Sequence, residues 1–375
     1  MARGRGTART HRPRAESEIA RCRSAIDRVD DRILDLLNQR ARLAQRIGRQ
    51  KVRSNAAVYV PGRERRVLER VLARNGGPLP RRAVLGIFRE ILSASRALQG
   101  PLRVAFLGPE ATFSHAAART QFGETAVYDP VEGIAEVFHA VETGRADVGV
   151  VPVENSTEGV VAHTLDVFVE SPLRICAELE LRVQQCLMAR PGSLRKVRRI
   201  VSHPQSLAQC RRWLATAYPG VPTEAVSSNA KAAQIAAADA TVAAIAGATA
   251  AERYGLRIIA DGIQDDPSNV TRFLVLATRD APSVTGADKT SILFTVRDEI
   301  GVLQKMLHPF ARHRINLCGI ESRPRRGKPW EYVFFLDLRG HRLQGPVRRA
   351  LADLERNCLT LKILGSYPSV VSEET

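Results

Sequence analysis

The sequence lacks the long apolar segments that mark membrane and secreted proteins. Its 375 residues contain no run of eighteen consecutive apolar residues, so no membrane-spanning helix is expected. The first residues, MARGRGTARTHRPR, are basic, but no apolar core follows them, so they are not typical of a secretory signal. We therefore expect a cytoplasmic protein whose residues 1–16 form a disordered basic tail.

Disulfide and metal-binding patterns are also missing. The six cysteines lie at positions 22, 176, 186, 210, 318 and 358, with no pair at CxxC spacing and no cluster with histidine. This spacing excludes the common zinc motifs and, in a chain of this size, favours reduced thiols. The sequence also has no legible P-loop, Ser–His–Asp triad or internal repeat.

Negative charge is scarce at the N-terminal end of the chain. Residues 1–100 hold 24 Lys and Arg against 9 Asp and Glu, a net charge of +15, whereas the whole chain carries +17. A solvated arginine-rich surface is the simplest interpretation. Binding of an anionic small molecule, or of nucleic acid, stays open at this point.

Residues 18–99 read as entirely helical. Apolar periodicity and the placement of Gly and Pro predict helices over residues 17–53, 61–77 and 81–100. At ~1.5 Å per residue the first helix is roughly 50 Å long, which is longer than a small domain is wide. It must therefore find a partner along its length.

After residue 101 the pattern changes to short apolar strands that alternate with helical segments. Strands are predicted at 102–108, 146–155, 198–204, 241–247 and 271–278. This alternation predicts a two-lobed α/β block with a largely parallel sheet, in which ligands bind outside the carboxyl ends of strands. From residue 289 the order strand, helix, strand, strand, helix, strand predicts an α+β ferredoxin-like block. The fold class is therefore multidomain: all-α, then α/β, then α+β.

The first predicted helix carries an apolar stripe that a charge interrupts. The stripe follows three- and four-residue steps through Ile26, Val29, Ile33, Leu36, Leu43 and Ile47. Arg40 occupies the stripe position between Leu36 and Leu43.

Other polar residues lie on the apolar sides of the helices in the same way: Lys51, Glu64, Ser95 and Gln99. An unpaired charge in an apolar core is costly, so the set with Arg40 predicts a small polar pocket for an anionic ligand. For any one of them, a side chain that reaches back to water is an equally good explanation.

Arg23 adds a geometric constraint. It precedes Arg40 by seventeen residues, or roughly 25 Å along one helix at ~1.5 Å per residue. Both side chains cannot reach one small ligand from one straight helix. If both bind it, Arg23 must come from a second chain, as in an antiparallel dimer of long helices that would also bury the stripe.

These spacings resemble the all-helical chorismate mutase domain, an intertwined dimer. The resemblance implies a pocket for the dianion chorismate, made by Arg23, Arg40, Lys51, Val60, Arg63, Glu64, Ser95 and Gln99. It implies that Arg23 comes from the partner subunit, that the arginines bind carboxylates, and that Lys51 and Gln99 meet the ether oxygen. Glu64 and Ser95 would meet the hydroxyl region, and Val60, which replaces an acidic residue of some members, could keep a contact only through its main chain. Arg40, Lys51 and Gln99 suffice as catalytic groups because the rearrangement needs a folded substrate and charge stabilised at oxygen.

The middle block places small polar residues after its strands, in FLGPEATFSHAAA (106–118), VPVENSTEG (151–159), SHPQSLAQC (202–210) and NVTRFLVLA (269–277). Each is weak alone, because Ser or Thr after a strand is usually a helix cap. Together they resemble prephenate dehydratase over residues 102–280. The resemblance implies that the Thr271 hydroxyl protonates the leaving hydroxyl of prephenate as the carboxylate departs as CO2. It implies that Arg272 lies near an anionic group of the substrate. It also implies that the residues lining the cleft are Glu154, Asn155, Ser156, Ser202, His203, Gln205, Asn269, Thr271, Arg272 and Phe273.

Two segments of the last block, GVLQKML (301–307) and ESRP (321–324), resemble the regulatory ACT domain of these dehydratases. The resemblance implies an inter-subunit phenylalanine site that includes Gly301, Val302, Leu303, Glu321, Ser322, Arg323 and Pro324. A ferredoxin-like module that only dimerises is the alternative.

The order of the three blocks resembles the bifunctional P-protein family of phenylalanine biosynthesis. This implies domains at 17–100, 101–281 and 289–368, a homodimer or larger homo-oligomer, and no metal, organic cofactor, membrane or nucleic-acid partner. One alternative is a two-lobed solute-binding protein, which would need a secretion signal. The other is an amino-acid-sensing regulator whose basic helical domain binds nucleic acid.

Overall fold

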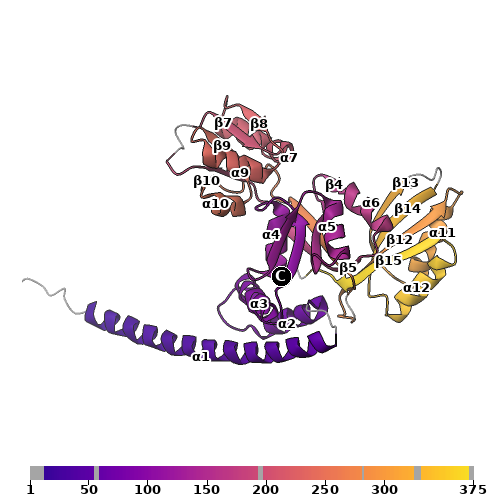
Figure 1. Ribbon diagram of the computed structural model, residues 1–375, viewed down its shortest axis with the longest axis horizontal. Helices are drawn as coiled ribbons and strands as arrows, with labels where there is room; N and C mark the ends of the chain where they lie inside the picture. Colours follow the sequence, from indigo (N-terminus) through magenta and orange to yellow (C-terminus); the bar gives the residue numbers. More distant parts are fainter. Residues whose placement is uncertain (1–11, 55–58, 193–196, 281–282, 325–330, 371–375) are drawn as a thin grey trace, which may run out of the picture.

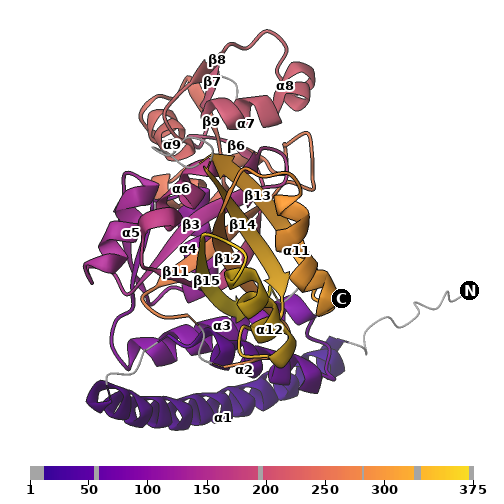
Figure 2. The same cartoon turned by 90° about the vertical axis from the view of Figure 1, so that its right-hand side faces the viewer.

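The computed structural model describes residues 12–54, 59–192, 197–280, 283–324 and 331–370. Figure 1 shows a helical unit at the bottom, a first α/β lobe above it, a second α/β lobe at the top, and an α+β unit beside the first lobe. Figure 2, turned by 90°, shows the long helix α1 running beneath the rest of the molecule.

The helical unit consists of α1 (Arg12–Arg53), α2 (Pro61–Arg74) and α3 (Arg81–Ala97). Proline suits the first position of α2, because the N–H of that position has no partner inside the helix. The three predicted helices are confirmed, but α1 begins before residue 17, so the end of the predicted tail is helical. The rest of that tail, residues 1–11, lies outside the described residues.

Among the described residues, it is the C-terminal part of α1 that packs on the other helices of the unit. Ala44 is buried there, and a Cβ on the buried Gly48 would lie 2.8 Å from Cγ of Gln99. The apolar stripe, by contrast, is 48–61% exposed in the single chain at Ile26, Val29, Ile33, Leu36, Leu43 and Ile47. Figure 1 shows the N-terminal part of α1 projecting beyond α2 and α3. One chain therefore does not bury the stripe.

The first α/β lobe is built on a sheet in the order β2-β1-β3-β11-β5, with β4 paired to β3. Its strands are β1 (Arg103–Leu107), β2 (Val127–Val131), β3 (Val148–Asn155), β4 (Gly159–Val160), β5 (Arg174–Arg182) and β11 (Val270–Ala277). Helix α4 (Phe113–Phe122) packs in one apolar core, and α5 (Ile134–Glu142) and α6 (Ala162–Glu170) pack in another, on the opposite face of the sheet.

The second lobe has a sheet in the order β10-β6-β9-β7-β8. Its strands are β6 (Cys186–Ala189), β7 (Arg199–Ser202), β8 (Thr223–Ala225), β9 (Val242–Ala246) and β10 (Arg257–Ala260). Its helices are α7 (Pro204–Gln209), α8 (Arg211–Ala217), α9 (Asn229–Ala238) and α10 (Ala248–Tyr254).

The prediction of a largely parallel sheet is wrong, because both sheets are mixed. Strand β11 runs antiparallel to β3 and β5, and β6 runs antiparallel to β9 and β10. An apolar run that is buried on both faces indicates a central strand, but it carries no information on the direction of that strand.

The α+β unit confirms the predicted order of its elements. These are β12 (Asp288–Arg297), α11 (Val302–Arg312), β13 (Leu317–Pro324), β14 (Glu331–Arg339), α12 (Gly345–Glu355) and β15 (Thr360–Pro368). The two helices pack on one face of the sheet β13-β14-β12-β15. From the other face, Leu293, Phe335 and Leu364 join Phe168 and Ile175 of the first lobe in one apolar core.

Within the described residues, no helix combines the length and the apolar character that crossing a bilayer requires. No group of three or more His, Cys, Asp or Glu side chains in this part of the chain is placed to hold a metal ion. The cysteines are free thiols.

Candidate functional site

Polar side chains meet between the helices of the helical unit. The Arg40 guanidinium donates hydrogen bonds to the Ser95 hydroxyl and, at 3.3 Å, to the Ile91 carbonyl oxygen. The side-chain amide of Gln99 donates to the Ser95 carbonyl oxygen at 3.1 Å. Its Oε1 is buried and has no hydrogen-bond partner among the described residues. We call this group, with Lys51 and Glu64, the helical cluster.

Glu64 lies among the cations of the helical cluster. Burial raises the pKa of the Glu64 carboxyl, against the opposing effects of Arg96, Lys51 and Arg40. Burial likewise lowers the pKa of Arg40 and that of Lys51, and the Glu64 carboxylate opposes both shifts. The five residues predicted from the apolar stripes therefore share one polar region. Its cations outnumber its carboxylate, which suits an anionic ligand.

Arg96 belongs to the same region and was not predicted from the sequence. It is 6% exposed, and its guanidinium pairs with Glu64 at 2.5 Å. It also donates to the carbonyl oxygen of Phe122, at the end of α4, at 2.6 Å. The only sequence signal is an arginine in the last turn of a helix, which is common at solvated helix ends.

Three further predicted residues lie at or beyond the edge of the helical cluster in a single chain. Arg63 is exposed on α2, next to Glu64. The Val60 carbonyl oxygen accepts from the N–H groups of Arg63 and Glu64, at 3.0 and 3.2 Å, so a main-chain contact with a ligand would have to use the Val60 N–H. Arg23 is exposed in the N-terminal third of α1.

In the first α/β lobe, the register of β11 against β3 sets Thr271 opposite Asn155. The Asn155 amide nitrogen donates to Thr271 Oγ1 and to Asn269 Oδ1, both at 2.8 Å. Its Oδ1 accepts from the N–H groups of Thr157 and Glu158, at 3.0 and 3.1 Å, which fixes the orientation of the amide. Because Asn155 donates to the Thr271 oxygen, the hydroxyl hydrogen of Thr271 stays free for another acceptor.

The predicted residues of the second lobe gather at the end of β7. Ser202 is fully buried; its hydroxyl donates to the Ile245 carbonyl oxygen at 2.6 Å and also lies 3.1 Å from Asn229 Oδ1. His203 caps α7, where its Nδ1 accepts from the N–H of Gln205 at 3.3 Å. Among the described residues, no hydrogen bond or ion pair joins this group directly to Thr271. Asn229 and Thr157 are polar partners that the sequence did not single out. Asn229 is the first residue of α9 and Thr157 lies in the turn after β3, where polar residues are common helix-start and turn residues.

The structure does not bring the predicted residues Arg272 and Glu154 together with Thr271. Neighbouring residues of a strand face opposite sides of the sheet, so Arg272 points away from Thr271 and toward the α+β unit. Its guanidinium pairs there with Asp337 at 2.6 Å and with Glu178 at 2.9 Å. Glu154 stands opposite Arg272 in the register of β3 and lies 3.8 Å from it.

Two more predicted contacts have structural explanations. Phe273 is 1% exposed and packs with Phe106 in the core beneath α4, so the structure places it in the core of the lobe. The Ser156 hydroxyl accepts from the N–H of Val270 at 3.0 Å and donates to the Ser268 carbonyl oxygen at 3.3 Å. It ties the turn after β3 to the start of β11.

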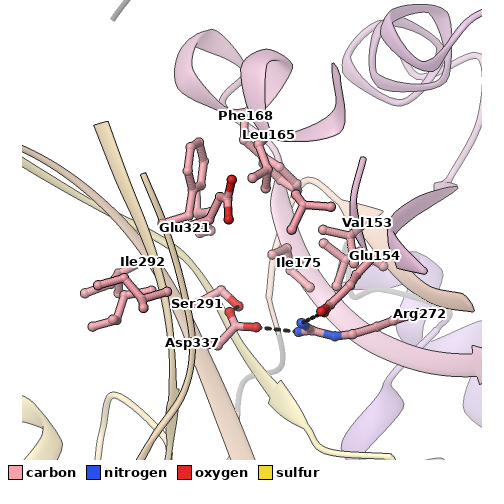
Figure 3. Close-up of a pocket in the computed structure, with 17 residues that line it drawn as sticks. Val153, Glu154, Leu165, Phe168, Ile175, Arg272, Ser291, Ile292, Glu321 and Asp337 are labelled. Atoms are coloured by element: carbon pink, nitrogen blue, oxygen red, sulfur yellow. Dashed lines mark hydrogen bonds and ion pairs between the residues drawn. The ribbon is translucent and has the colours of Figure 1, made fainter. Parts of the chain in front are cut away.

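A cavity of about 110 Å³ lies between the sheet of the first lobe and the sheet of the α+β unit. Figure 3 shows Glu321 pointing into this mostly apolar space, with Arg272 also in its wall. Two residues further along β13, Arg323 pairs with Asp166 of α6 at 3.0 Å. Gly301 lines a different hollow, between α11 and α12. In a single chain, the two predicted regulatory segments do not share either of these spaces.

The other predicted regulatory residues lie mainly at the surface. Leu303 of α11 is 40% exposed, and Ser322 and Pro324 are exposed on the edge strand β13. Val302 packs partly into the core of the α+β unit. Both segments are thus accessible to a second subunit.

Comparison with known protein families finds a match in each block. The family described as Chorismate mutase type II matches residues 22–100, the family Prephenate dehydratase matches residues 104–281, and the ACT domain matches residues 290–356.

Curated relatives match this chain over nearly its whole length. A bifunctional chorismate mutase/prephenate dehydratase from Aquifex aeolicus is 48% identical over 361 residues, which are 95% of this chain and 99% of that protein. A protein with the same description from Stutzerimonas stutzeri is 46% identical over 360 residues, 94% of this chain and 98% of the relative. Among solved structures, prephenate dehydratase from Arthrobacter aurescens in complex with L-Phe has a TM-score of 0.66 at 36% identity, over 72% of this chain and 93% of that chain.

Proposed function

The chain belongs to the family of bifunctional chorismate mutase/prephenate dehydratases, and from this premise we propose which of its residues carry each reaction. The protein converts chorismate to prephenate and then prephenate to phenylpyruvate, with release of CO2 and water. Phenylalanine, the product of the pathway, inhibits it through the ACT domain. The alternative of a nucleic-acid-binding regulator is not favoured.

The mutase reaction takes place in the helical cluster. It breaks a C–O bond and forms a C–C bond within one molecule, so the protein must hold a folded conformer and stabilise charge at the ether oxygen. Lys51 and Gln99 donate to that oxygen. The remaining contacts, to the two carboxylates and the hydroxyl of chorismate, come from Arg40, Arg63, Glu64 and Ser95. The convergence of Arg40, Lys51 and Gln99 on one partly buried region is the observation that carries this assignment.

A second chain completes the mutase site. The exposed apolar stripe of α1 would stay in water in a monomer, although it is long enough for a helix of another subunit to cover. An antiparallel dimer buries the stripe and carries Arg23 of the partner subunit to the helical cluster, roughly 25 Å from where the chain's own Arg23 lies at ~1.5 Å per residue. The protein is accordingly a homodimer or a larger homo-oligomer.

The dehydratase reaction uses the Thr271 hydroxyl as the proton donor. The C–C bond to the ring carboxylate breaks and CO2 leaves, its bonding electrons enter the ring, and the C–O bond to the ring hydroxyl breaks. The Thr271 proton goes to that hydroxyl, so the leaving group is water, and solvent returns a proton to Thr271. Negative charge grows on Thr271 Oγ1 during this transfer, and the 2.8 Å hydrogen bond from Asn155 stabilises it.

Asn269 extends this arrangement, because its side-chain nitrogen is buried without a hydrogen-bond partner among the described residues. It is a donor available to a carboxylate of prephenate. Ser202, His203 and Gln205 of the second lobe complete the substrate contacts when the lobes close on the ligand.

Phenylalanine binds between subunits at the two segments Gly301–Leu303 and Glu321–Pro324. Two contacts then connect this region to the dehydratase. Arg323 pairs with Asp166 of α6. Asp337, on β14 of the α+β unit's sheet (here called the regulatory sheet), pairs with Arg272, which is next to Thr271 on β11. A shift of the regulatory sheet therefore acts directly on the strand that carries the proton donor.

The protein works in the cytoplasm and without nucleic acid. Its basic N-terminal part gives the excess of positive charge. Within the helical unit, however, Arg40, Lys51 and Arg96 all lie near the Glu64 carboxylate, and Arg40 also donates to the Ile91 carbonyl oxygen. These cations are not available to a phosphate backbone.

Two variants test the separate-site assignment. Thr271→Ala should stop phenylpyruvate formation and let prephenate accumulate from chorismate, because the helical cluster is untouched. Arg40→Ala should stop chorismate consumption and spare dehydration of added prephenate. Loss of both activities in either folded variant would contradict the assignment, as would normal activity of both.

A further inference from the structure

Arg96 is the most deeply buried arginine of the helical unit whose charge faces the mutase region. It stands in the last turn of α3, and its side chain is 7% exposed. One guanidinium nitrogen lies 2.5 Å from Glu64 Oε1, and another lies 2.6 Å from the Phe122 carbonyl oxygen. The rings of Tyr59 and Phe122 each lie 5.8 Å from the guanidinium carbon.

The Arg96 guanidinium is thus surrounded by one carboxylate, one carbonyl oxygen and two aromatic rings. A buried guanidinium is stable when its charge is paired and its remaining N–H groups are satisfied, and aromatic faces add a favourable contribution. The partner that supplies the opposite charge is Glu64, a residue of the proposed mutase site. The arginine is therefore tied to the site through one side chain and to the dehydratase lobe through the carbonyl at the end of α4.

A second residue of α3, Ser93, also contacts the end of α4. The Ser93 hydroxyl donates to the Phe122 carbonyl oxygen at 2.6 Å and contacts Thr125 Oγ1 at 2.7 Å. A Cβ on Gly123 would lie 2.6 Å from Ser93. The end of α4 and the last turns of α3 are thus in close contact, so the position of Arg96 is set by the dehydratase lobe.

We propose that Arg96 is a positioning residue for the mutase reaction: it holds Glu64 as an oriented carboxylate toward the hydroxyl region of chorismate and anchors this pair on the dehydratase lobe. The proposal rests on the proposed role of Glu64 in the mutase site. It adds a residue that lies off the apolar stripe of α3, and a contact through which one catalytic domain supports the other.

The charges around Glu64 give the proposal a pH signature. Arg40 and Lys51 face Glu64 from α1, Arg96 faces it from α3, and Arg63 is its neighbour on α2. Burial raises the pKa of Glu64, and Arg96 is the strongest group that opposes this effect. A function that needs the Glu64 carboxylate is lost as pH falls through that pKa. Removal of Arg96 raises the pKa further, so the acid limb of the mutase profile moves to higher pH.

The experiment measures mutase kcat/KM against pH for the full chain and for Arg96→Met, Arg96→Lys and the control Arg82→Met. Arg82 is an exposed arginine of the same helix. We expect Arg96→Met to lower kcat/KM about 100-fold at neutral pH, the loss typical of a catalytic group that moves by about 1 Å, and to shift the acid limb upward. Arg96→Lys should recover part of the activity, and Arg82→Met should change nothing. Dehydration of added prephenate reports whether each variant is folded.

A double-mutant cycle with Glu64→Gln separates positioning from general support of the fold. If Arg96 acts through Glu64, Arg96→Met should cost little more in the Glu64→Gln background. Equal losses in both backgrounds, with an unshifted pH profile, would overturn the proposal. Full mutase activity of Glu64→Gln would instead contradict the proposed mutase site itself, so the two failures are distinguishable.

Discussion

Asn155→Asp is a nearly isosteric change that reverses one hydrogen bond at the proposed dehydratase site. In the wild-type chain the Asn155 amide nitrogen donates to Thr271 Oγ1 and to Asn269 Oδ1, both at 2.8 Å. A carboxylate cannot donate, so it faces the Asn269 oxygen with another acceptor and takes the hydroxyl hydrogen of Thr271 for itself. The proton that should pass to prephenate is then engaged.

The size of the effect follows from these contacts. The loss of one donor that stabilises developing charge typically lowers kcat by about 10²–10³, or about 2.7–4 kcal/mol. The free energy of unfolding should fall by about 1–3 kcal/mol, because the hydrogen bond to Asn269 is lost and its buried Oδ1 is left unpaired. The bonds from Thr157 and Glu158 to Oδ1 can persist in the variant, since an aspartate oxygen accepts as well as the amide oxygen does.

The assay follows phenylpyruvate formation from added prephenate, with chorismate consumption by the same chain as the internal control. Activity of the variant should rise as pH falls, because a protonated aspartic acid can donate to Thr271 again. Thr157→Val is the matched control: it removes one 2.7 Å hydrogen bond to Asn155 Oδ1 and leaves the bond to Thr271. The dehydratase activity of Thr157→Val should fall by no more than about tenfold, the effect expected for the loss of one neutral hydrogen bond. If Asn155→Asp dehydrated prephenate at the wild-type rate, the role given to the Asn155 donor would be refuted.

Three glycine substitutions, one of them a control on an open helix face, test the packing that positions the sites. Gly48→Ala should lower mutase activity and spare the dehydratase, because its Cβ would lie 2.8 Å from Cγ and 3.0 Å from Cα of Gln99. Gly86→Ala, on an open face of α3, should instead raise stability by about 0.5–1 kcal/mol through helix propensity, and thermal unfolding with both activity assays separates the two outcomes. Gly365→Ala would place a Cβ 2.1 Å from the Ile175 carbonyl oxygen. It should lower Tm and weaken inhibition by phenylalanine, and an unchanged Tm with normal inhibition would contradict the described contact between β15 and β5.

The helices and many strands could be predicted because their apolar periodicity depends only on local burial. The predicted order of the α+β unit is confirmed for this reason. Strand direction was not predictable from the same signal. A strand such as β11, buried on both faces, looks alike whether its neighbours run parallel or antiparallel to it, and the mixed sheets followed from contacts between distant segments.

The helical cluster was partly predictable because polar residues interrupt stripes that should be apolar. Arg96 was not, because it follows Ser95 directly and its partners lie on another helix and in another lobe. The direction in which Arg272 points had a signal in the sequence. Two adjacent residues of one strand cannot face the same cleft, so assigning Thr271 to substrate already directed Arg272 to the opposite side.

The claim that two chains complete each mutase site is tested most directly by mixed dimers of Arg23→Ala and Arg40→Ala, purified through two different tags. Each variant alone should consume almost no chorismate. In the mixed dimer one site combines the intact Arg40 of one chain with the intact Arg23 of the other, whereas the second site lacks both. We predict about half of the wild-type mutase activity for the mixed dimer, as the two-fold symmetry of a shared site requires. A mixed dimer no more active than either parent would contradict the account.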